Sequence, residues 1–422
     1  MHVAWVGKKS PFCGNVVYSR EVTKALVDRG HRVSFIHYDF DENDAIATAN
    51  KDDGAAWPDL REVSIPCLYK STYVILQSPK ASKVLVEALQ ELKPDLVHVS
   101  GPVSFLDAQL PDICHSLGLP LVVTFHLPFD NNKRFNWASG TQMLWYQVCA
   151  RTLAKCDRTI IFSQNQKDLL VRLGVTAERV AVIPNSVDAL KYSPGPSNLK
   201  AELGAERVFV YQGRLAVEKN VESLLKAWKL AEMAPSSKLA IVGDGPLRSS
   251  LQSPGDSECG IVWMGYIGED DRRIEILRGA DVFILPSLVE GLSLSLLEAM
   301  SCGLACLATD VGADGEVLAD GAGVVLDPAK IVAQLQTLLP LFQDHPELAS
   351  MLGYKARQRI LERYRSSENI SRLEQLYAEV LPQKSQSLRS NLDPMSKANV
   401  SSTAMKSPSP QTPLPRERDF KG

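Results

Sequence analysis

Short apolar runs alternate with amphipathic stretches along most of this 422-residue chain. Runs such as Arg32–Tyr38 and Leu121–His126 are rich in β-branched and aromatic residues, which is typical of buried strands. A helical pattern from about Val17 to Arg29 precedes the first of these runs and ends at Gly30. A strand, a helix and a second strand in this order predict a βαβ unit with parallel strands. The expected fold class is therefore α/β, with doubly wound, Rossmann-like sheets.

The alternation pauses near residue 190 and then restarts. Residues 191–203 contain the run Ser193-Pro194-Gly195-Pro196, which is typical of a linker. We therefore predict one domain over residues 1–190 and a second over residues 204–381, facing each other across a ligand cleft. A long helical stretch from about Ile331 to Leu381 closes the second domain, and we expect its end to return to the first. Residues 382–422 are dominated by Ser, Pro, Lys and Thr, which predicts a disordered tail.

Composition excludes several classes of protein. The net charge of -3 argues against a nucleic-acid binder. No apolar run approaches the ~20 residues that span a bilayer, and the N-terminus lacks the pattern of a signal peptide. The 8 cysteines form no CxxC pair, so neither a zinc site nor a disulfide framework is indicated. We expect a cytoplasmic protein that needs neither a metal nor a bound cofactor.

Two carboxylates eight residues apart, Glu290 and Glu298, follow the predicted strand Val282–Leu285. We expect Glu290 in a loop and Glu298 about two turns into a helix that runs from Leu292 to Met300. A helix start binds anions through its free N–H groups, and a glycine beside it lets a ligand approach. Together these features predict a pocket for a sugar and a phosphate. A solvent-facing loop acid and an unrelated helix acid would also explain the spacing. The candidate contacts at the helix start are Gly291, Leu292 and Ser293.

A second group of candidates lies in the stretch Tyr211–Asn220, between a predicted strand and a predicted helix. Gly213 permits close approach of the backbone to a ligand. Arg214 and Lys219 are placed to hold one anion, as a diphosphate leaving group requires when charge builds on its oxygens. The alternative is that both are solvated surface cations.

Other candidates lie where further strands are predicted to end. Gly243 belongs to a Gly-Asp-Gly turn, and Gly265 and Ile267 end a strand whose backbone could contact a base. In the first half, Gly14 follows the first strand and His126 follows the strand Leu121–Phe125. Plain turns, core strand ends and a structural histidine are the alternatives.

These motifs resemble glycosyltransferase family 4, whose members have the GT-B fold and retain the configuration of the transferred sugar. The matching stretches are G-R-L-A-V-E-K-N, V-G-D-G-P, I-P-N-S-V-D and the run from A-D-V-F-I-L-P-S to E-A-M-S-C-G. The resemblance implies that Arg214 and Lys219 hold the donor diphosphate and that Glu290 contacts the donor sugar. It implies ribose binding by Glu298 and contacts of His126 to outer sugar hydroxyls. Gly14 would line the acceptor and phosphate loop, where the family often has Gly-Gly instead of Gly14-Asn15.

The opening M-H-V-A-W-V-G-K-K-S-P-F-C-G-N resembles cyanobacterial members assigned to digalactosyldiacylglycerol synthesis. That resemblance implies galactose transfer from UDP-galactose to monogalactosyldiacylglycerol by an enzyme peripherally bound to the membrane. Basic and aromatic residues suited to an interface occur at 133–137, at 143–146 and between Lys70 and Lys83. Ordinary alternation of core and surface explains them equally well. A transferase with a soluble acceptor or a UDP-glucose donor, a nucleotide-sugar epimerase and a non-catalytic binding subunit are the other functions considered.

Overall fold

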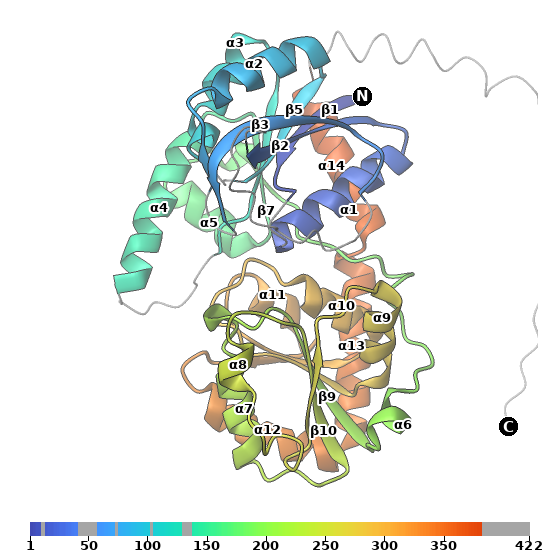
Figure 1. Cartoon of the computed structure of the whole chain (residues 1–422). Helices are drawn as coiled ribbons and strands as arrows, with labels where there is room; N and C mark the ends of the chain where they lie inside the picture. The colour runs from blue at the N-terminus through green and yellow to red at the C-terminus, as the bar shows by residue number, and fades with distance from the viewer. Residues whose placement is uncertain (10–12, 41–56, 72–74, 102–103, 129–136, 382–422) are drawn as a thin grey trace, which may run out of the picture. The chain divides into compact units, whose positions relative to one another are not determined.

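The first of two parallel sheets is built from the N-terminal half of the chain (Figure 1). The computed structural model describes residues 1–9, 13–40, 57–71, 75–101, 104–128 and 137–381. The strand order is β4-β3-β2-β1-β5-β6-β7-β8, and only β4 runs antiparallel to its neighbour. The strands are β1 His2–Gly7, β2 Arg32–Phe40, β3 Arg61–Lys70, β4 Ile75–Gln77, β5 Leu96–Gly101, β6 Leu121–Phe125, β7 Arg158–Ile161 and β8 Val180–Val182.

The sequence pattern predicts helices from about Val17 to Arg29 and over Ala81–Leu92, Leu106–Leu117 and Leu144–Ala154. All four regions are helical, but the last helix begins earlier, at Trp137. Helical periodicity predicts one helix over Leu106–Leu117, but the structure divides this stretch at Gln109 into a 3₁₀ turn and a short α-helix, because Pro111 has no N–H and favours a helix start. The strands β3 and β4 and the helix α5 were not predicted. The helices are α1 Gly14–Asp28, α2 Ala81–Leu92, η1 Phe105–Ala108, α3 Leu110–Ser116, α4 Trp137–Leu153, α5 Gln164–Arg172 and η2 Ala177–Arg179.

The second sheet has the order β11-β10-β9-β12-β13-β14, and all its pairs are parallel. Its strands are β9 Arg207–Gln212, β10 Ser237–Val242, β11 Ile261–Gly265, β12 Val282–Leu285, β13 Ala305–Thr309 and β14 Val324–Leu326. Figure 1 shows α7 and α12 on one side of this sheet and α9, α10 and α13 on the other. The fold class is thus the predicted one, with two Rossmann-like parallel sheets.

The helices of the second half complete this arrangement. They are α6 Leu199–Leu203, η3 Val217–Lys219, α7 Val221–Leu230, α8 Arg248–Leu251, α9 Asp270–Gly279, α10 Leu294–Cys302 and α11 Asp314–Leu318. The predicted helical stretch from Ile331 to Leu381 is divided into α12 Ile331–Asp344, α13 Pro346–Arg363 and α14 Ser366–Val380. Pro346 cannot continue α12 and instead occupies the first position of α13.

The last helix, α14, packs against the first sheet and its helix α1, as the sequence predicted. Arg29 at the end of α1 donates to Glu374 at 2.6 Å. Inside the sheet, the imidazole of His98 shares a hydrogen bond with the hydroxyl of Tyr377, and both side chains are fully buried. The linker and domain boundaries stay predictions, and the predicted tail lies outside the described residues.

In each sheet the strand order reverses once, between β1 and β5 in the first and between β9 and β12 in the second. The loops that follow such strands diverge, so the edge of the sheet is open to a ligand there. Gly14 and Ser100 flank the first switch point, and Lys219 and Glu290 flank the second.

Candidate functional site

The loops after β9 and β12 are held together by backbone hydrogen bonds at the switch point of the second sheet. The N–H of Leu288 donates to the carbonyl of Glu218 at 2.8 Å. Asn220 has left-handed backbone geometry, with φ of 51°, and its side chain donates to the carbonyl of Pro286 at 3.2 Å. These contacts bring together two predicted motifs that lie about seventy residues apart.

Lys219 and Glu290 form an ion pair across these two loops. The hydroxyl of Ser287 donates to the same Glu290 oxygen at 2.8 Å, and Glu290 is only 9% exposed. Burial alone would lower the pKa of Lys219, but the charge and hydrogen bond of Glu290 outweigh it and raise the pKa. Lys219 is therefore cationic at neutral pH and is not a solvated surface group.

The side chain of Arg214, the other predicted cation, is more exposed to solvent than that of Lys219. Its guanidinium pairs with Glu218 at 3.0 Å, and 37% of its side chain is exposed. Arg214 and Lys219 thus each have an acidic partner in this structure. That both hold a single diphosphate stays a prediction.

The helix after β12 begins later than the sequence indicated. Helix α10 starts at Leu294, and the Ser293 side chain caps it by accepting from the N–H of Leu296 at 3.3 Å. The N–H of Ser293 itself donates to Asp314 at 2.9 Å. Among the predicted N–H donors, that of Ser293 is therefore already used within the protein.

Asp314 is a residue of this region that sequence reasoning missed. It lies at the start of α11, is fully buried, and supports the Glu290 loop from behind. Burial first, and the charge of Glu290 second, raise the pKa of Asp314 well above its usual range. The run Gly312-Ala313-Asp314 was the sequence signal for this residue, because it places an acid directly after a glycine turn. A Cβ at Gly312 would lie 2.4 Å from the carbonyl oxygens of Glu290 and Gly291, so only glycine fits there.

Glu298 lies one turn into α10, not two, because the helix starts at Leu294. Its carboxylate accepts from the side-chain amide of Gln212 at 2.8 Å. Gln212 ends β9, so the sequence distance between these partners hid the contact. Burial raises the pKa of Glu298 to about 7, although the charge of Arg273 and hydrogen bonds from Tyr192 and Gln212 oppose this rise.

The predicted glycine loops pack closely against one another. Gly243 has a φ of +135°, and a Cβ there would lie 1.9 Å from the carbonyl oxygen of Gly213. The N–H of Gly243 donates to the carbonyl of Gly265 at 2.7 Å. Glycine is therefore required at position 243 by close contact with the backbone after β9, and at position 265 it is favoured by a φ of +72°. The carbonyl of Ile267 accepts from Arg273 at 3.3 Å, so it already has a donor within the protein.

His126 follows β6, as predicted, and lies among buried rings of the first sheet. Its Nε2 is 2.9 Å from the hydroxyl of Ser100, and its ring packs edge-on against Tyr18 and Phe162. Burial, helped by the charge of Lys8, lowers the pKa of His126 to about 3. Gly14 opens helix α1, and a Cβ there would meet nothing within 4 Å.

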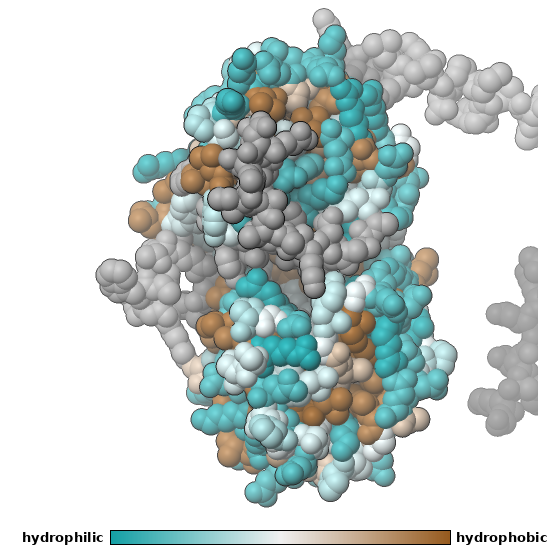
Figure 2. Space-filling model, in the orientation of Figure 1, coloured by the Kyte–Doolittle hydropathy of each residue, from teal (hydrophilic) through white to brown (hydrophobic). Residues whose placement is uncertain are grey.

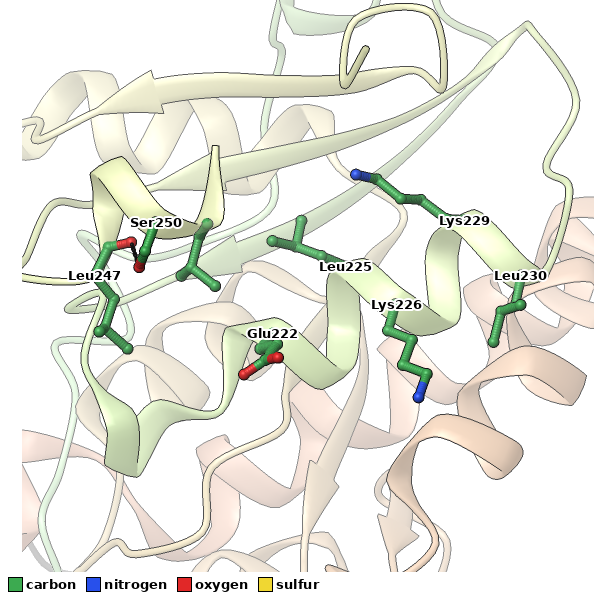
Figure 3. A pocket seen from close by; sticks show the side chains of 8 residues that line it. Glu222, Leu225, Lys226, Lys229, Leu230, Leu247 and Ser250 are labelled. Atoms are coloured by element: carbon green, nitrogen blue, oxygen red, sulfur yellow. Dashed lines mark hydrogen bonds between the residues drawn. The ribbon is translucent and has the colours of Figure 1, made fainter. Parts of the chain in front are cut away.

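A pocket of about 500 Å³ lies elsewhere on the second half, between α7 and the segment that contains α8 (Figure 3). Figure 3 shows Leu225, Lys226 and Lys229 projecting from α7, and Ser250 donating to the carbonyl of Leu247 at 2.9 Å. None of the residues that line it is a predicted site residue. The described part of the chain has no helix that is long and apolar enough to cross a bilayer. The described residues also contain no group of three His, Cys, Asp or Glu side chains arranged to hold a metal ion.

Comparisons with known proteins agree with this arrangement. A family model described as Glycosyltransferase Family 4 matches residues 13–189, and one described as Glycosyl transferases group 1 matches residues 206–344. A similar protein of Escherichia coli is named UDP-Gal:alpha-D-GlcNAc-diphosphoundecaprenol alpha-1,3-galactosyltransferase. It is 28% identical over 346 residues, which cover 77% of this chain and 85% of that protein. Alpha-maltose-1-phosphate synthase of Mycolicibacterium smegmatis is 29% identical over 273 residues, which cover 58% of this chain and 70% of that protein.

Solved structures share the fold. The crystal structure of Anabaena HepE in complex with UDP matches with a TM-score of 0.68 at 16% sequence identity. The match covers 90% of this chain and 100% of that one.

Proposed function

The chain belongs to glycosyltransferase family 4, whose members transfer a sugar from a nucleotide-sugar donor, and we propose that it moves a hexose from a UDP-sugar to a glycolipid. The observation that carries the donor half of this proposal is the ion pair between Lys219 and Glu290 at the β9–β12 switch point. It joins a cation suited to a diphosphate with a carboxylate suited to sugar hydroxyls.

The proposed roles follow from what each group offers. Lys219 and Arg214 stabilise the charge that develops on the diphosphate as the glycosidic bond breaks. Each such charge-assisted contact contributes about 1.5–3 kcal/mol. Glu290 accepts hydrogen bonds from the sugar, and Glu298 accepts them from the ribose. The acceptor hydroxyl attacks the anomeric carbon on the face that the diphosphate leaves, so configuration is retained.

The proposed acceptor is a lipid with a sugar headgroup, reached at a membrane surface. Helix α4 supports this because four of its apolar side chains are exposed, and Leu144 is the most exposed at 62%. Apolar side chains in contact with water are unfavourable, and a lipid surface would cover them. The four are Met143, Leu144, Trp145 and Val148.

Tyr146 belongs to the run 143–146 that was predicted to suit a membrane interface. It is buried, and its hydroxyl donates to the carbonyl of Leu127 at 3.0 Å. It therefore belongs to the core. The edge of the first sheet adds a second exposed apolar group, Leu68, Tyr69 and Leu76. Figure 2 shows hydrophobic residues at several places on one face of the molecule, among hydrophilic ones. The basic and aromatic residues at 133–136 lie outside the described residues, and nothing is described of the side chain of Trp137.

Galactose is the proposed sugar and digalactosyldiacylglycerol the proposed product, formed from monogalactosyldiacylglycerol by a peripherally bound cytoplasmic enzyme. The name of the Escherichia coli relative combines a UDP-galactose donor with a lipid-linked acceptor, which supports a similar pairing here. The name of the Mycolicibacterium relative describes synthesis of a sugar phosphate, which supports a soluble acceptor as the second candidate.

One assay separates these candidates. The purified protein is incubated with UDP-galactose or UDP-glucose, with and without detergent-dispersed monogalactosyldiacylglycerol, and UDP release and lipid products are measured. We expect UDP release only with UDP-galactose and the lipid together, with a digalactolipid as product. Equal UDP release with a soluble sugar acceptor alone would reject the lipid acceptor. Tight binding of UDP without turnover under any condition would instead indicate a non-catalytic binding subunit.

A further inference from the structure

Asn15, Ser100 and His126 form a continuous hydrogen-bonded row at the switch point of the first sheet. The Ser100 hydroxyl lies 2.8 Å from Oδ1 of Asn15 and 2.9 Å from Nε2 of His126. Ser100 is the penultimate residue of β5 and is fully buried, so water does not supply its partners. Asn15 lies in the first turn of α1, directly after Gly14.

The orientation of the Asn15 amide is determined by a backbone group. Its Nδ2 donates to the carbonyl oxygen of Ser100 at 3.3 Å. A carbonyl oxygen can only accept, so the nitrogen of the amide must face it. Oδ1 therefore faces the Ser100 hydroxyl.

The proton of Ser100 has two possible acceptors, and they differ in what they can do. Oδ1 of Asn15 can only accept, whereas Nε2 of a neutral imidazole accepts in one tautomer and donates in the other. If Ser100 donated to His126, Oδ1 would keep only the distant hydroxyl of Ser19, at 3.4 Å. If Ser100 donates to Asn15, the Ser100 oxygen accepts from Nε2–H and from Ser19 at 3.1 Å. The second arrangement satisfies every group with shorter contacts.

We propose that Asn15, acting through Ser100, holds His126 in the Nε2–H tautomer, so that Nδ1 accepts a hydrogen bond from a hydroxyl of the donor sugar. The identity of that hydroxyl as a donor-sugar group rests on the proposed function, whereas the tautomer does not. Asn15 is a positioning residue because it acts only through Ser100. No described residue is hydrogen-bonded to Nδ1, so this lone pair has no partner in the described part of the chain.

The surroundings of the ring are consistent with this role. Tyr18 packs edge-on against the imidazole with ring centroids 4.8 Å apart, and Phe162 does so at 5.2 Å, so the ring is held in place. A Cβ at Gly291 would lie 3.8 Å from the carbonyl oxygen of His126, which brings the donor loop close to this segment. A neutral ring that accepts at Nδ1 selects a sugar carrying a free hydroxyl at the contacted carbon.

The tautomer is measured directly by NMR on the ligand-free protein labelled with ¹⁵N in its histidines. His126→Gln identifies the His126 signals by their loss. We expect a protonated Nε2 and an unprotonated Nδ1 in the native protein. In Asn15→Ala the Ser100 proton is released to Nε2, so the Nδ1–H form should become the major one. Ser19→Ala, which leaves the row intact, should keep the native pattern.

A Nδ1–H tautomer in the native protein, or an unchanged tautomer in a folded Asn15→Ala, would overturn the proposal. If Asn15→Ala does not fold, Ser100→Ala removes the same link and should give a mixture of both tautomers, and a pure Nε2–H form there would also overturn it. Kinetics test the ligand separately. Asn15→Ala should raise the KM for the UDP-sugar about five- to tenfold with little change in kcat, as expected for one lost hydrogen bond. A changed tautomer without turnover on any UDP-sugar would contradict the proposed function alone.

Discussion

The side chain of Asp314 accepts a hydrogen bond from the backbone N–H of Ser293 at 2.9 Å, directly in front of helix α10. A carboxyl group placed here removes one of the free N–H groups that the helix start would otherwise present. It also lies in a fully buried position close to Glu290, whose charge disfavours a second negative charge. Burial and this charge therefore favour the neutral form of Asp314, whose carboxyl group supports the donor loop through its hydrogen bond to Ser293.

Asp314→Asn tests this protonation state. A neutral acid and an amide have the same shape and both accept through one oxygen, so Asp314→Asn should change the free energy of unfolding by less than about 1 kcal/mol at pH 7. Asp314→Ala leaves the Ser293 N–H without a partner and should cost about 1–3 kcal/mol. Urea unfolding of both variants measures the difference. A large loss of stability in Asp314→Asn would mean that the group is ionised.

Lys219→Ala should lower kcat at least about tenfold, since it removes a charge-assisted contact to the leaving diphosphate. The change also leaves the buried Glu290 without its partner, so the Tm of the variant must be measured alongside its turnover. Lys226→Ala is the matched control, because Lys226 lies one helix further along the chain with an exposed side chain. Full turnover in a folded Lys219→Ala protein would remove Lys219 from the proposed site.

The pH dependence of donor binding should report Glu298. Its pKa of about 7 lies above the usual value for glutamate, so the group is mostly protonated below pH 7 and ionised above it. An ionised carboxylate is the stronger acceptor for ribose hydroxyls, so affinity for a UDP-sugar should fall as the pH falls from 8 to 6. Calorimetric titrations at several pH values measure this, with a UDP-sugar because its diphosphate does not titrate in that range.

Glu298→Gln provides the comparison for that measurement. Its amide does not titrate, so its affinity should be weaker at pH 8 and nearly constant between pH 6 and 8. A native protein with constant affinity over the same range would show that the ionisation of Glu298 plays no part in donor binding.

Replacement of the exposed apolar groups on α4 should separate membrane docking from chemistry. We expect Leu144→Gln combined with Trp145→Gln to reduce binding to vesicles of anionic and galactolipids by about tenfold or more, since the apolar area that lipid would cover is lost. Activity on detergent-dispersed acceptor should remain near the native level.

Tyr354→Gln is the control for the α4 variant, because Tyr354 on α13 is also an exposed large side chain, at 68%, and is not part of the proposed docking surface. It should bind vesicles as the native protein does. Equal loss of binding in both variants would mean that docking does not depend on α4.

Much of this protein follows from local sequence patterns. Hydrophobic periodicity predicted the α/β class, and it predicted the bounds of β12 to the residue, because that strand is a short apolar run with clear ends. The motifs around Lys219 and Glu290 were predicted to bind parts of the same donor. The structure brings the two side chains together as an ion pair, and their binding roles stay predictions. Elements with weaker patterns were missed: most residues of β3 are at least partly exposed, and the edge strand β14 has only three residues.

Only the tertiary structure decided which distant segments of the chain contact each other. The switch points depend on which strands pair, and pairing is a long-range choice that local periodicity does not encode. The raised pKa of Asp314, the contact of Gln212 with Glu298 and the row from Asn15 to His126 arise in this way. Burial and neighbouring charges set the protonation of these groups, and both exist only once the chain is folded.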